Sequence, residues 1–373
     1  MRFIFYCCLL FAAFYLLSCG NHDQHRHAFY YWKTTYNTDT ATVRRVANSG
    51  ADKFYIRYLD VDWSETHHMP VPLGELQVEY RDCPFIVSNY VPVVFITNRT
   101  FEQMSPEWTD SLAFKLTRRV ERITNGLEAT FIDRHLYDIP GYNDNYYTTA
   151  RPPLDTMIGK LRERVTTEIQ IDCDWAASTR EKYFRFLRRF KELNKGKTIS
   201  VTLRLYPYKY LDKVGVPPVD RAMLMCYNLG KIKDSNTRNS ILDITEMKQY
   251  FSAKAYPLPL DIALPVFGWF AWFRQGQYKG IVHEHQNFVA DTTLFKKHKD
   301  NSYAITADTV IADNYYRMGD ELRYEQPSDA DVQAAADIAA KHVPGYGTIS
   351  FFDWNDHSIV TYEKAIQAVF TRH

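Results

Sequence analysis

The sequence predicts an α/β fold, a single (β/α)8 TIM barrel with insertions, and three observations support this prediction. Eight apolar segments with the pattern of β-strands alternate with helical segments along the chain, which is the order of parallel βα units. The 373 residues suffice for a barrel of ordinary size plus extra segments. The chain contains no glycine-rich GxGxxG or phosphate-loop pattern that would indicate a doubly wound sheet.

The expected strands are short segments in which apolar residues alternate with polar ones or run continuously. A continuous apolar run is typical of a strand that is buried on both faces. In chain order, the eight strands are expected at 29–32, 53–62, 90–97, 168–175, 198–206, 222–229, 261–269 and 347–353.

The segments between these strands carry apolar residues at helical spacing. Helices are expected at 40–48, 108–123, 154–165, 178–193, 240–251, 329–342 and 358–370. Two stretches, 128–153 and 270–327, interrupt the alternation and are expected to be insertions, the second with some helix. The barrel domain is therefore expected to span 28–373.

The fourth expected strand is the one that indicates a functional site. Its residues alternate strictly, with Gln170, Asp172 and Asp174 on one face and apolar residues on the other. The rise of a strand places the two carboxylates about 7 Å apart. Because ligand sites of parallel βα barrels lie at the carboxyl ends of the strands, this acidic pair is expected at the barrel mouth.

The N-terminus indicates export. A short basic start, Met1-Arg2, is followed by an apolar run at 3–17 and by Leu16-Leu17-Ser18-Cys19-Gly20. This segment resembles a bacterial lipoprotein signal peptide at 1–19 with its lipobox. The resemblance implies cleavage before Cys19, lipidation of that cysteine with palmitate-type chains, and a protein held by its lipid at a cell-envelope membrane. An uncleaved apolar anchor is the alternative, and residues 20–27 are expected to be a tether.

The net charge and the aromatic content of the chain indicate which class of partner it can bind. The formal net charge is +1 and no basic stripe with interleaved aromatic residues is present, so no nucleic-acid partner is expected. Aromatic residues make up 15% of the chain, which suits stacking against sugar rings, although large aromatics also simply fill a core.

Neither a disulfide framework nor a metal site is expected. Without the signal peptide and Cys19, three cysteines remain, Cys83, Cys173 and Cys226, which is not a disulfide framework. The sequence His283-Glu284-His285 has ligand types but lacks a recognised metal-binding spacing. We therefore expect no metal and no cofactor.

Several strand ends should bring polar and aromatic side chains to one mouth. The residues concerned are Trp32, Asp172, Asp174, Arg204, Tyr206, Met225, Tyr227, Asn228, Trp269, Asp353 and Trp354. Three short motifs among them, Asp172-x-Asp174, Met225-x-Tyr227-Asn228 and Trp354, lie on the fourth, sixth and eighth strands. In these motifs and in strand order, the chain resembles family 18 glycoside hydrolases, the chitinase-like barrels. The resemblance implies a glycan site at the mouth.

The chain departs from the family pattern at its most important position. Family members carry Asp-x-x-Asp-x-Asp-x-Glu on the fourth strand and Met-x-Tyr-Asp on the sixth. Here Ala176 stands where the catalytic glutamate would be, Ile169 replaces the first aspartate, and Asn228 replaces the aspartate of the sixth strand. Protonation of the leaving oxygen requires a carboxylic acid, which alanine cannot supply.

Two arrangements of the mouth therefore stay open. In one, Asp174 is the general acid, Asp172 orients the substrate amide, and Tyr227 and Asn228 donate hydrogen bonds, so that all four are catalytic. In the other, arginines such as Arg204 neutralise the two aspartates in an ion network.

The first hypothesis for function is a glycoside hydrolase that acts on an extracytoplasmic glycan such as an amino-sugar polymer. For substrate binding it would use Trp32, Arg204, Tyr206, Trp269, Asp353 and Trp354. A non-catalytic glycan-binding barrel, in which tryptophans stack on sugar, is the second hypothesis. The third is a cell-envelope scaffold. Pairing of both Asp172 and Asp174 with arginine would favour the second.

Overall fold

The computed structural model describes residues 25–36, 40–78, 89–137, 167–251, 255–284, 286–299, 301–311 and 313–373. Cys19, Cys83 and the helix expected at 154–165 lie outside this part of the chain. None of the helices in the described ranges is both long enough and apolar enough to cross a membrane.

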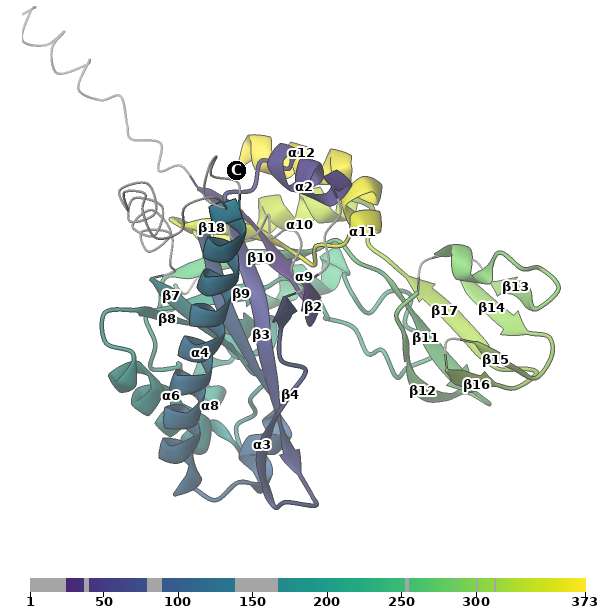
Figure 1. Cartoon of the computed structure of the whole chain (residues 1–373). Helices are drawn as coiled ribbons and strands as arrows, with labels where there is room; N and C mark the ends of the chain where they lie inside the picture. Colours follow the sequence, from purple (N-terminus) through teal and green to yellow (C-terminus); the bar gives the residue numbers. More distant parts are fainter. Residues whose placement is uncertain are drawn as a thin grey trace, which may run out of the picture.

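Parallel strands close into a barrel (Figure 1). A nine-stranded sheet contains eight parallel strands that follow one another in chain order, plus one antiparallel strand, β4 (Met69–Leu73). The first strand pairs with both the second and the last, which closes the sheet and confirms the predicted fold class. The parallel strands are β1 (Arg26–Tyr31), β3 (Lys53–Ser64), β6 (Asn89–Ile96), β7 (Glu168–Asp172), β8 (Thr198–Arg204), β9 (Arg221–Met225), β10 (Leu260–Pro265) and β18 (Thr348–Phe352).

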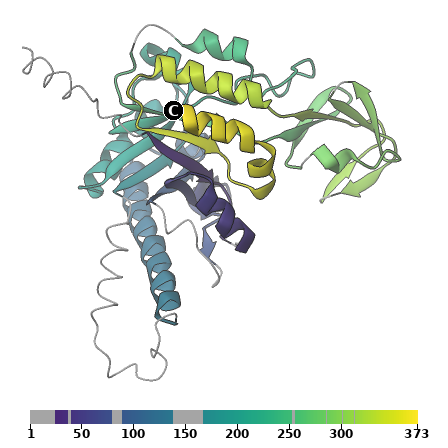
Figure 2. The same ribbon diagram turned by 90° about the horizontal axis from the view of Figure 1, so that it is seen from above.

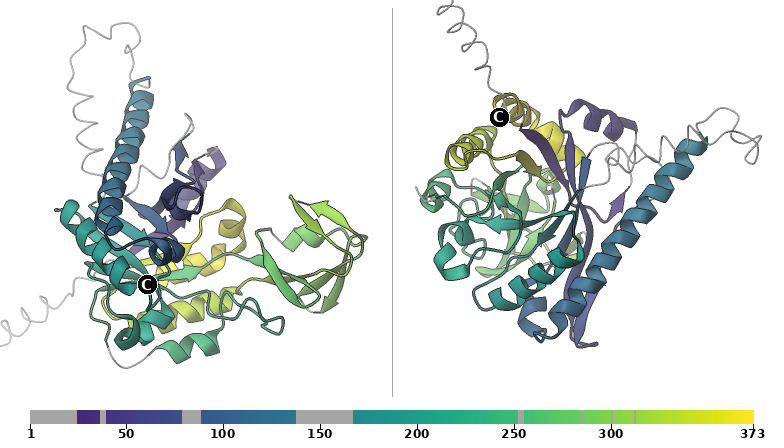
Figure 3. Two further views of the ribbon diagram at one scale, coloured as in Figure 1. Left: turned by 90° about the horizontal axis from the view of Figure 1, so that it is seen from below. Right: turned by 90° about the vertical axis from the view of Figure 1, so that its left-hand side faces the viewer.

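Helices cover the outside of the barrel (Figures 1 and 2). The longest helix of the described residues, α4, extends beyond the barrel (Figure 3). Helix α10 begins with a capping box of Ser328 and Asp331. The helices are α2 (Thr40–Asn48), α3 (Asn98–Gln103), α4 (Trp108–Tyr137), α6 (Arg180–Leu193), α7 (Leu205–Lys209), α8 (Leu211–Val214), α9 (Ile244–Tyr250), α10 (Asp329–His342), α11 (Asp356–Thr361) and α12 (Glu363–Arg372).

Because side chains alternate along each strand, one set points into the barrel and the other points outward against the helices. Tyr30 and Tyr55 stack on each other inside the barrel with their ring centres 4.7 Å apart. Phe29 and Phe351 point the other way and contact Phe370 of α12. The interior of the barrel is therefore partly polar, whereas the layer between strands and helices is apolar.

A β-bulge between Arg57 and Leu59 changes which residues of β3 face inward. Tyr58 reaches Thr124 of α4 at 3.3 Å, and Leu59 also faces α4, so two consecutive residues point outward. Asp60 returns to the side of Arg57 and forms an ion pair with it. The bulge therefore places Asp60 at the inner side of the barrel.

The expected insertion after the seventh strand is present but consists mainly of β-strands. Apart from the short 3-10 helix η2 (Gln286–Val289), it forms a five-stranded antiparallel sheet and a hairpin that project from the barrel (Figure 1). The strands are β11 (Trp269–Arg274), β12 (Gln277–Val282), β13 (Phe295–Lys299), β14 (Ser302–Ile305), β15 (Thr309–Ile311), β16 (Asn314–Tyr316) and β17 (Glu321–Glu325).

Several predicted boundaries differ from the structure, and three of them affect the tether or the insertions. The seventh barrel strand ends at Pro265, and Trp269 begins the inserted sheet, which has its own apolar core. The first strand begins at Arg26, and His27 stacks on Phe370, so the tether predicted to reach residue 27 ends earlier. The start of the 128–153 stretch continues α4 to Tyr137, and the rest lies outside the described residues.

A short pair of parallel strands, β2 (Thr35–Tyr36) and β5 (Gln77–Val78), lies beside the barrel.

Candidate active site

Asp172 is the last residue of β7 and lies inside the barrel just below its mouth. Its side chain is almost buried, with 8% of the residue exposed, and it accepts a hydrogen bond of 2.5 Å from Thr202 Oγ1. Burial, aided by the nearby charge of Asp174, raises the pKa of Asp172 from 3.8 to about 7. Asp172 is therefore a carboxyl group that can hold a proton near neutral pH.

Asp174 lies in a different environment, although it is only two residues away. Its carboxylate is exposed and accepts from Arg204 Nε at 3.0 Å. This contact is a charge-assisted hydrogen bond that engages the Asp174 carboxylate. The expected role of Asp174 as general acid is thus less well supported than a role for Asp172. Among the described residues, Asp174 pairs with an arginine and Asp172 does not.

An aromatic wall of Trp32, Tyr227, Phe267 and Phe352 lines the same mouth. Phe352 is its centre: its ring stacks on Tyr227 at 5.5 Å and lies 5.3 Å from Trp32 and 5.7 Å from Phe267. Trp32 and Phe352 are half-buried, whereas the other two are buried. The wall therefore offers two partly accessible rings to a ligand.

Arg57 holds the accessible indole in place. Its guanidinium group lies 5.3 Å over the ring of Trp32, and its Nη1 donates to the Trp32 carbonyl oxygen at 3.3 Å. Asp60 completes this group through its ion pair with Arg57.

The expected role of Trp354 as a sugar-stacking residue is wrong. Trp354 is 1% exposed and packs against Phe29 and Phe54, with ring centres 4.9 and 5.8 Å away, in the layer outside the strands. Phe352 occupies the mouth instead. The signal for it was in the sequence: Ser350 points inward on β18, so period-two alternation also directs Phe352 inward.

Trp269 also does not face a ligand. It is buried at the junction with the inserted sheet, where its Nε1 donates to Glu325 Oε2 at 3.3 Å. Glu325 in addition pairs with Arg323 and accepts from Ser240. This network is fully paired and fixes the base of the inserted sheet, so the expected binding role of Trp269 is wrong.

Tyr227 and Asn228 follow β9 and differ in exposure. Tyr227 is buried in the aromatic wall, and this burial raises the pKa of its hydroxyl. Asn228 is exposed, has a φ of 56°, and donates its backbone N–H to the Ile241 carbonyl at 2.7 Å. Asparagine tolerates this left-handed conformation better than most residues, so a backbone role accounts for its presence.

The remaining expected residues lie at the edge of the mouth or outside it. Tyr206 is 49% exposed directly after β8. Asp353 is half-buried, and burial raises its pKa to about 6 against the opposing effects of its own backbone N–H and of Lys33. Asp62 accepts from Thr97 at 2.5 Å, whereas Asp356 pairs with Arg45 on the outer surface.

The opposite end of the barrel, which we call the floor, also contains buried acids. Glu168 pairs with Lys53 Nζ at 2.7 Å and accepts from Ser200 Oγ at 2.6 Å. Asp261 pairs with Arg221 at 2.6 Å and accepts from the backbone N–H of Thr348 at 2.8 Å. Each floor carboxylate is therefore balanced by a cation.

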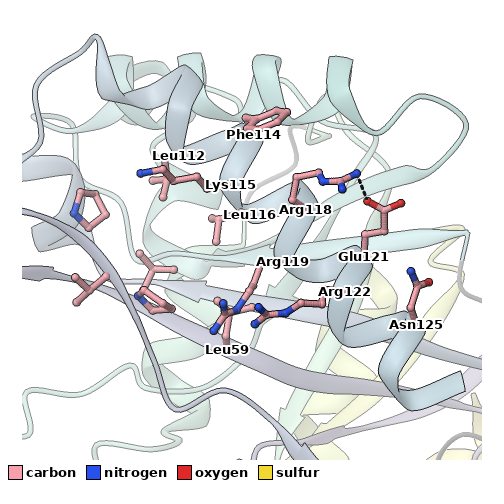
Figure 4. Close-up of a pocket in the computed structure, with 14 residues that line it drawn as sticks. Leu59, Leu112, Phe114, Lys115, Leu116, Arg118, Arg119, Glu121, Arg122 and Asn125 are labelled. Carbon is pink, nitrogen blue, oxygen red and sulfur yellow. Dashed lines mark hydrogen bonds and ion pairs between the residues drawn. The ribbon is translucent and has the colours of Figure 1, made fainter. Parts of the chain in front are cut away.

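The described residues contain no metal site, and a groove among them lies away from the mouth. Nowhere in these ranges do three His, Cys, Asp or Glu side chains gather to hold a metal ion. A groove of about 630 Å³ lies outside the barrel between β4 and α4, where Arg118 pairs with Glu121 (Figure 4). Arg119 and Arg122 in the same groove both pair with Glu75. The charges of this groove are therefore largely balanced.

No protein-family model matches this chain, and no curated protein matches it either. Among solved structures, the spore cortex-lytic enzyme SleL of Bacillus cereus is similar with a TM-score of 0.45 and 15% sequence identity, over 92% of this chain and 73% of that one. SleL of Bacillus megaterium QM B1551 has a TM-score of 0.45 and 10% identity, over 88% of this chain and 70% of that one.

A third similar structure is the xylanase and α-amylase inhibitor protein XAIP-II of Scadoxus multiflorus, with a TM-score of 0.42 and 10% identity, over 92% of this chain and 96% of that one. Likeness at these levels identifies neither a family nor an activity. The function has to be argued from the side chains at the mouth.

Proposed function

We propose that this chain is a glycan-binding barrel whose mouth holds a sugar ring against the aromatic wall. The proposal rests on one observation. Half-buried Trp32 and Phe352 lie at the same end of the strands as Asp172 and the Asp174–Arg204 pair. The faces of a sugar ring are apolar and pack on aromatic rings, while its hydroxyl groups hydrogen-bond to charged side chains. A few polar groups beside an apolar wall are typical of small-ligand sites.

Three substitutions relative to family 18 glycoside hydrolases favour binding over turnover. Ala176, Ile169 and Asn228 stand where that family has acidic residues. Ala176 interacts through its backbone, which donates to Thr179 Oγ1 at 3.0 Å. The exposed acid nearest to this position, Asp174, is held by Arg204. The mouth thus keeps the means to bind a sugar and has lost the family's proton donor.

Hydrolysis is the second candidate, and the raised pKa of Asp172 favours it. A general acid works best when its pKa lies near the working pH, and the pKa of Asp172 is about 7. In this case Asp172 gives its proton to the glycosidic oxygen as the bond between that oxygen and the anomeric carbon breaks. Water then adds its hydroxyl group to the anomeric carbon, and its other proton restores the acid form of Asp172. The substrate would be an amino-sugar polymer or a related glycan outside the cytoplasm.

The test compares binding and reducing-sugar release over a panel of amino-sugar polymers and host-type glycans. We expect the wild-type chain to bind one of them without turnover, and Phe352→Ala to weaken binding about tenfold through the lost stacking surface. Tyr315→Ala is the control, because Tyr315 is an exposed tyrosine on the inserted hairpin. Turnover that vanishes in Asp172→Asn would establish the hydrolase instead, and absence of both activities would refute the proposal.

We also propose that the chain is exported and held at a cell-envelope membrane by lipid on Cys19. The lipobox sequence Leu16-Leu17-Ser18-Cys19-Gly20 supports this proposal. Labelled palmitate should enter the wild-type chain and not Cys19→Ala. Equal labelling of both chains would contradict it.

A further inference from the structure

We infer that the groove between β4 and α4, outside the barrel, binds one long-chain amphiphile with an acidic head group, such as a fatty acid. This groove lies away from the mouth, and the inference does not depend on the proposed function. Three features of the groove support it: an apolar lining, a wall with few backbone donors, and an excess of cations toward one end.

The lining of the groove is apolar where β3 leaves its pairing with the first strand. Strand β3 pairs with β1 through residues 53–56 and with β4 through residues 60–64, and the bulge between these regions turns Leu59 toward α4. Phe114 lies in the lining with 55% of the residue exposed (Figure 4). The buried apolar residues of the lining are Leu59, Val61, Pro70, Leu112 and Leu116. A ligand with an apolar chain can therefore bury that chain along the groove.

One wall of the groove has few backbone hydrogen-bond donors. Pro70 and Pro72 alternate with Val71 on β4, and Val71 lies opposite Asp62 of β3 in register. Proline has no N–H, so these two positions cannot donate to a ligand. An extended peptide in the groove would leave some of its own carbonyl groups without partners, which is costly over an apolar surface. An acyl chain has no such groups, so this wall favours a lipid chain over a peptide strand.

The dimensions of the groove also favour a slender ligand. Its lining on α4 runs from Leu112 to Asn125, which is about 20 Å at the rise of an α-helix. Two turns of a helix with its side chains occupy roughly 900 Å³, because such a helix is about 10–12 Å wide. The groove, of about 630 Å³, is smaller than this. A single extended acyl chain is narrower than a helix and comparable with the groove in length.

The pairing of charges in the groove leaves an excess of cations. Glu121 pairs with Arg118. A single carboxylate, that of Glu75, is shared by Arg119 and Arg122. The cations of the lining are Lys115, Arg118, Arg119 and Arg122. Among the described residues of the groove, four cations and two carboxylates therefore leave a net charge of +2.

The ion pairs of the groove leave its arginines accessible to a ligand. The side chains of Arg118 and Arg122 are 68% and 60% exposed. Ion pairs between exposed side chains are weak, because water screens them. An acidic head group can therefore bind these arginines without breaking a strong contact.

The groove is cationic toward one end and apolar toward the other. Arg119 and Arg122 lie about two turns along α4 from Leu112, and Figure 4 shows their guanidinium groups next to each other. Two adjacent guanidinium groups suit a carboxylate or a phosphate, which they can bind through several charged hydrogen bonds. The direction of the groove thus places the head group at these arginines and the acyl chain toward Leu112 and Phe114.

The experiment uses the full chain in a neutral maltoside detergent and a palmitate analogue with a photoreactive diazirine in its acyl chain. After irradiation, we expect labelled peptides from α4 and β4, and we expect excess palmitate to compete but excess hexadecanol not to compete. Arg122→Gln should lower this labelling about tenfold, because a charged hydrogen bond to the head group is lost. Arg189→Gln is the matched control, because Arg189 also pairs with a glutamate on an exposed helix face.

A second pair of variants tests the apolar part of the groove. Val71 is half-buried on β4, so Val71→Asp places a charge in the groove on a strand at the edge of the sheet. We expect this variant to lose the labelling of α4 and β4 while its unfolding temperature stays close to that of wild type. Val71→Ile keeps the apolar surface and should be labelled as wild type.

Four results would overturn the inference. Absence of label on α4 and β4 in the wild-type chain would show that the groove does not bind the probe. Equal labelling of wild type and Arg122→Gln would show that the acidic head group is not recognised there. Labelling that falls in Phe114→Ala but not in Val71→Asp would indicate contact with a flat lipid surface. Labelling that appears only in Cys19→Ala would mean that the chain's own lipid fills the groove.

Discussion

Buried acids have different partners at the two ends of the barrel. At the floor, Glu168 and Asp261 each have a cationic partner, Lys53 and Arg221, at 2.7 and 2.6 Å. At the mouth, Asp172 is equally enclosed but has a hydroxyl group as its hydrogen-bond partner. Within the described residues, no lysine or arginine forms an ion pair with Asp172.

This difference separates acids that stabilise the fold from an acid that is available for a function. A buried carboxylate without a cation costs several kcal/mol, and the cost is removed by pairing or by protonation. The floor acids are paired. Asp172 instead has a pKa of about 7, and such uncompensated groups concentrate at functional sites. The floor acids therefore have a structural role, and the unpaired state of Asp172 supports the ligand contact that we propose at the mouth.

The largest effect should come from breaking a floor pair. Lys53→Ala leaves the Glu168 carboxylate buried beside the Ser200 hydroxyl alone, which should lower the free energy of unfolding by about 3–5 kcal/mol. Denaturant titration at pH 7 measures this loss. The double variant Lys53→Met with Glu168→Gln is the control and should recover most of it. A loss below about 1 kcal/mol in Lys53→Ala would remove the distinction between the two ends.

Replacing Asp172, the acid at the mouth, should raise the free energy of unfolding rather than lower it. In the unfolded chain Asp172 loses its proton near pH 3.8, but in the folded chain it does so near pH 7, so its contribution to stability falls as pH rises between these values. Asp172→Asn does not titrate and should be more stable than wild type at pH 8 by a margin on the order of 4 kcal/mol.

Thermal unfolding of wild type and Asp172→Asn from pH 4 to pH 8 gives the measurement. The two curves should lie close together near pH 4 and separate as the pH rises. Parallel curves would show that Asp172 is not a group with a raised pKa, and the contrast with the floor would then disappear.

The smallest effect on stability is expected at the exposed ion pair of the mouth. Arg204 and Asp174 are both solvent-accessible, so Arg204→Ala should change the free energy of unfolding by less than about 1 kcal/mol. Glycan binding should nevertheless fall about tenfold, because Arg204 supplies charged hydrogen-bond donors to the ligand. Arg189→Ala, on the outer face of α6, is a matched control. A large loss of stability in Arg204→Ala would mean that this pair is structural.

The sequence predicts the barrel because its local patterns agree with the fold. Alternation along the strands gives the eight parallel strands, and the inward face of Gln170 and Asp172 follows from it directly. The same alternation places Ser350, Phe352 and Trp354 on one face, so it does not distinguish the two rings. Strand β18 ends at Phe352, and Trp354 beyond the strand end packs outside the strands against Phe29.

Other features depend on distant parts of the chain and could not be predicted locally. The apolar segment 261–269 spans two strands because the chain leaves the barrel after Pro265 and enters the inserted sheet at Trp269. The bulge that turns Asp60 inward has no clear sequence signal. The spacing of Asp172 and Asp174 predicts repulsion that raises the pKa of one of them, but the larger cause of the raised pKa of Asp172 is burial, which requires the enclosure supplied by several strands.

The base of the inserted sheet has a consequence for how the molecule can be altered. Trp269 and Glu325 are opposite one another in register, so the chain enters and leaves this sheet at neighbouring points. A segment with adjacent ends can be removed and its ends joined by a short turn without displacing the elements on either side. The part of the inserted sheet beyond this base can thus be lengthened, shortened or replaced, provided that the contacts of Trp269 and Glu325 with Phe267 and Ser240 are kept.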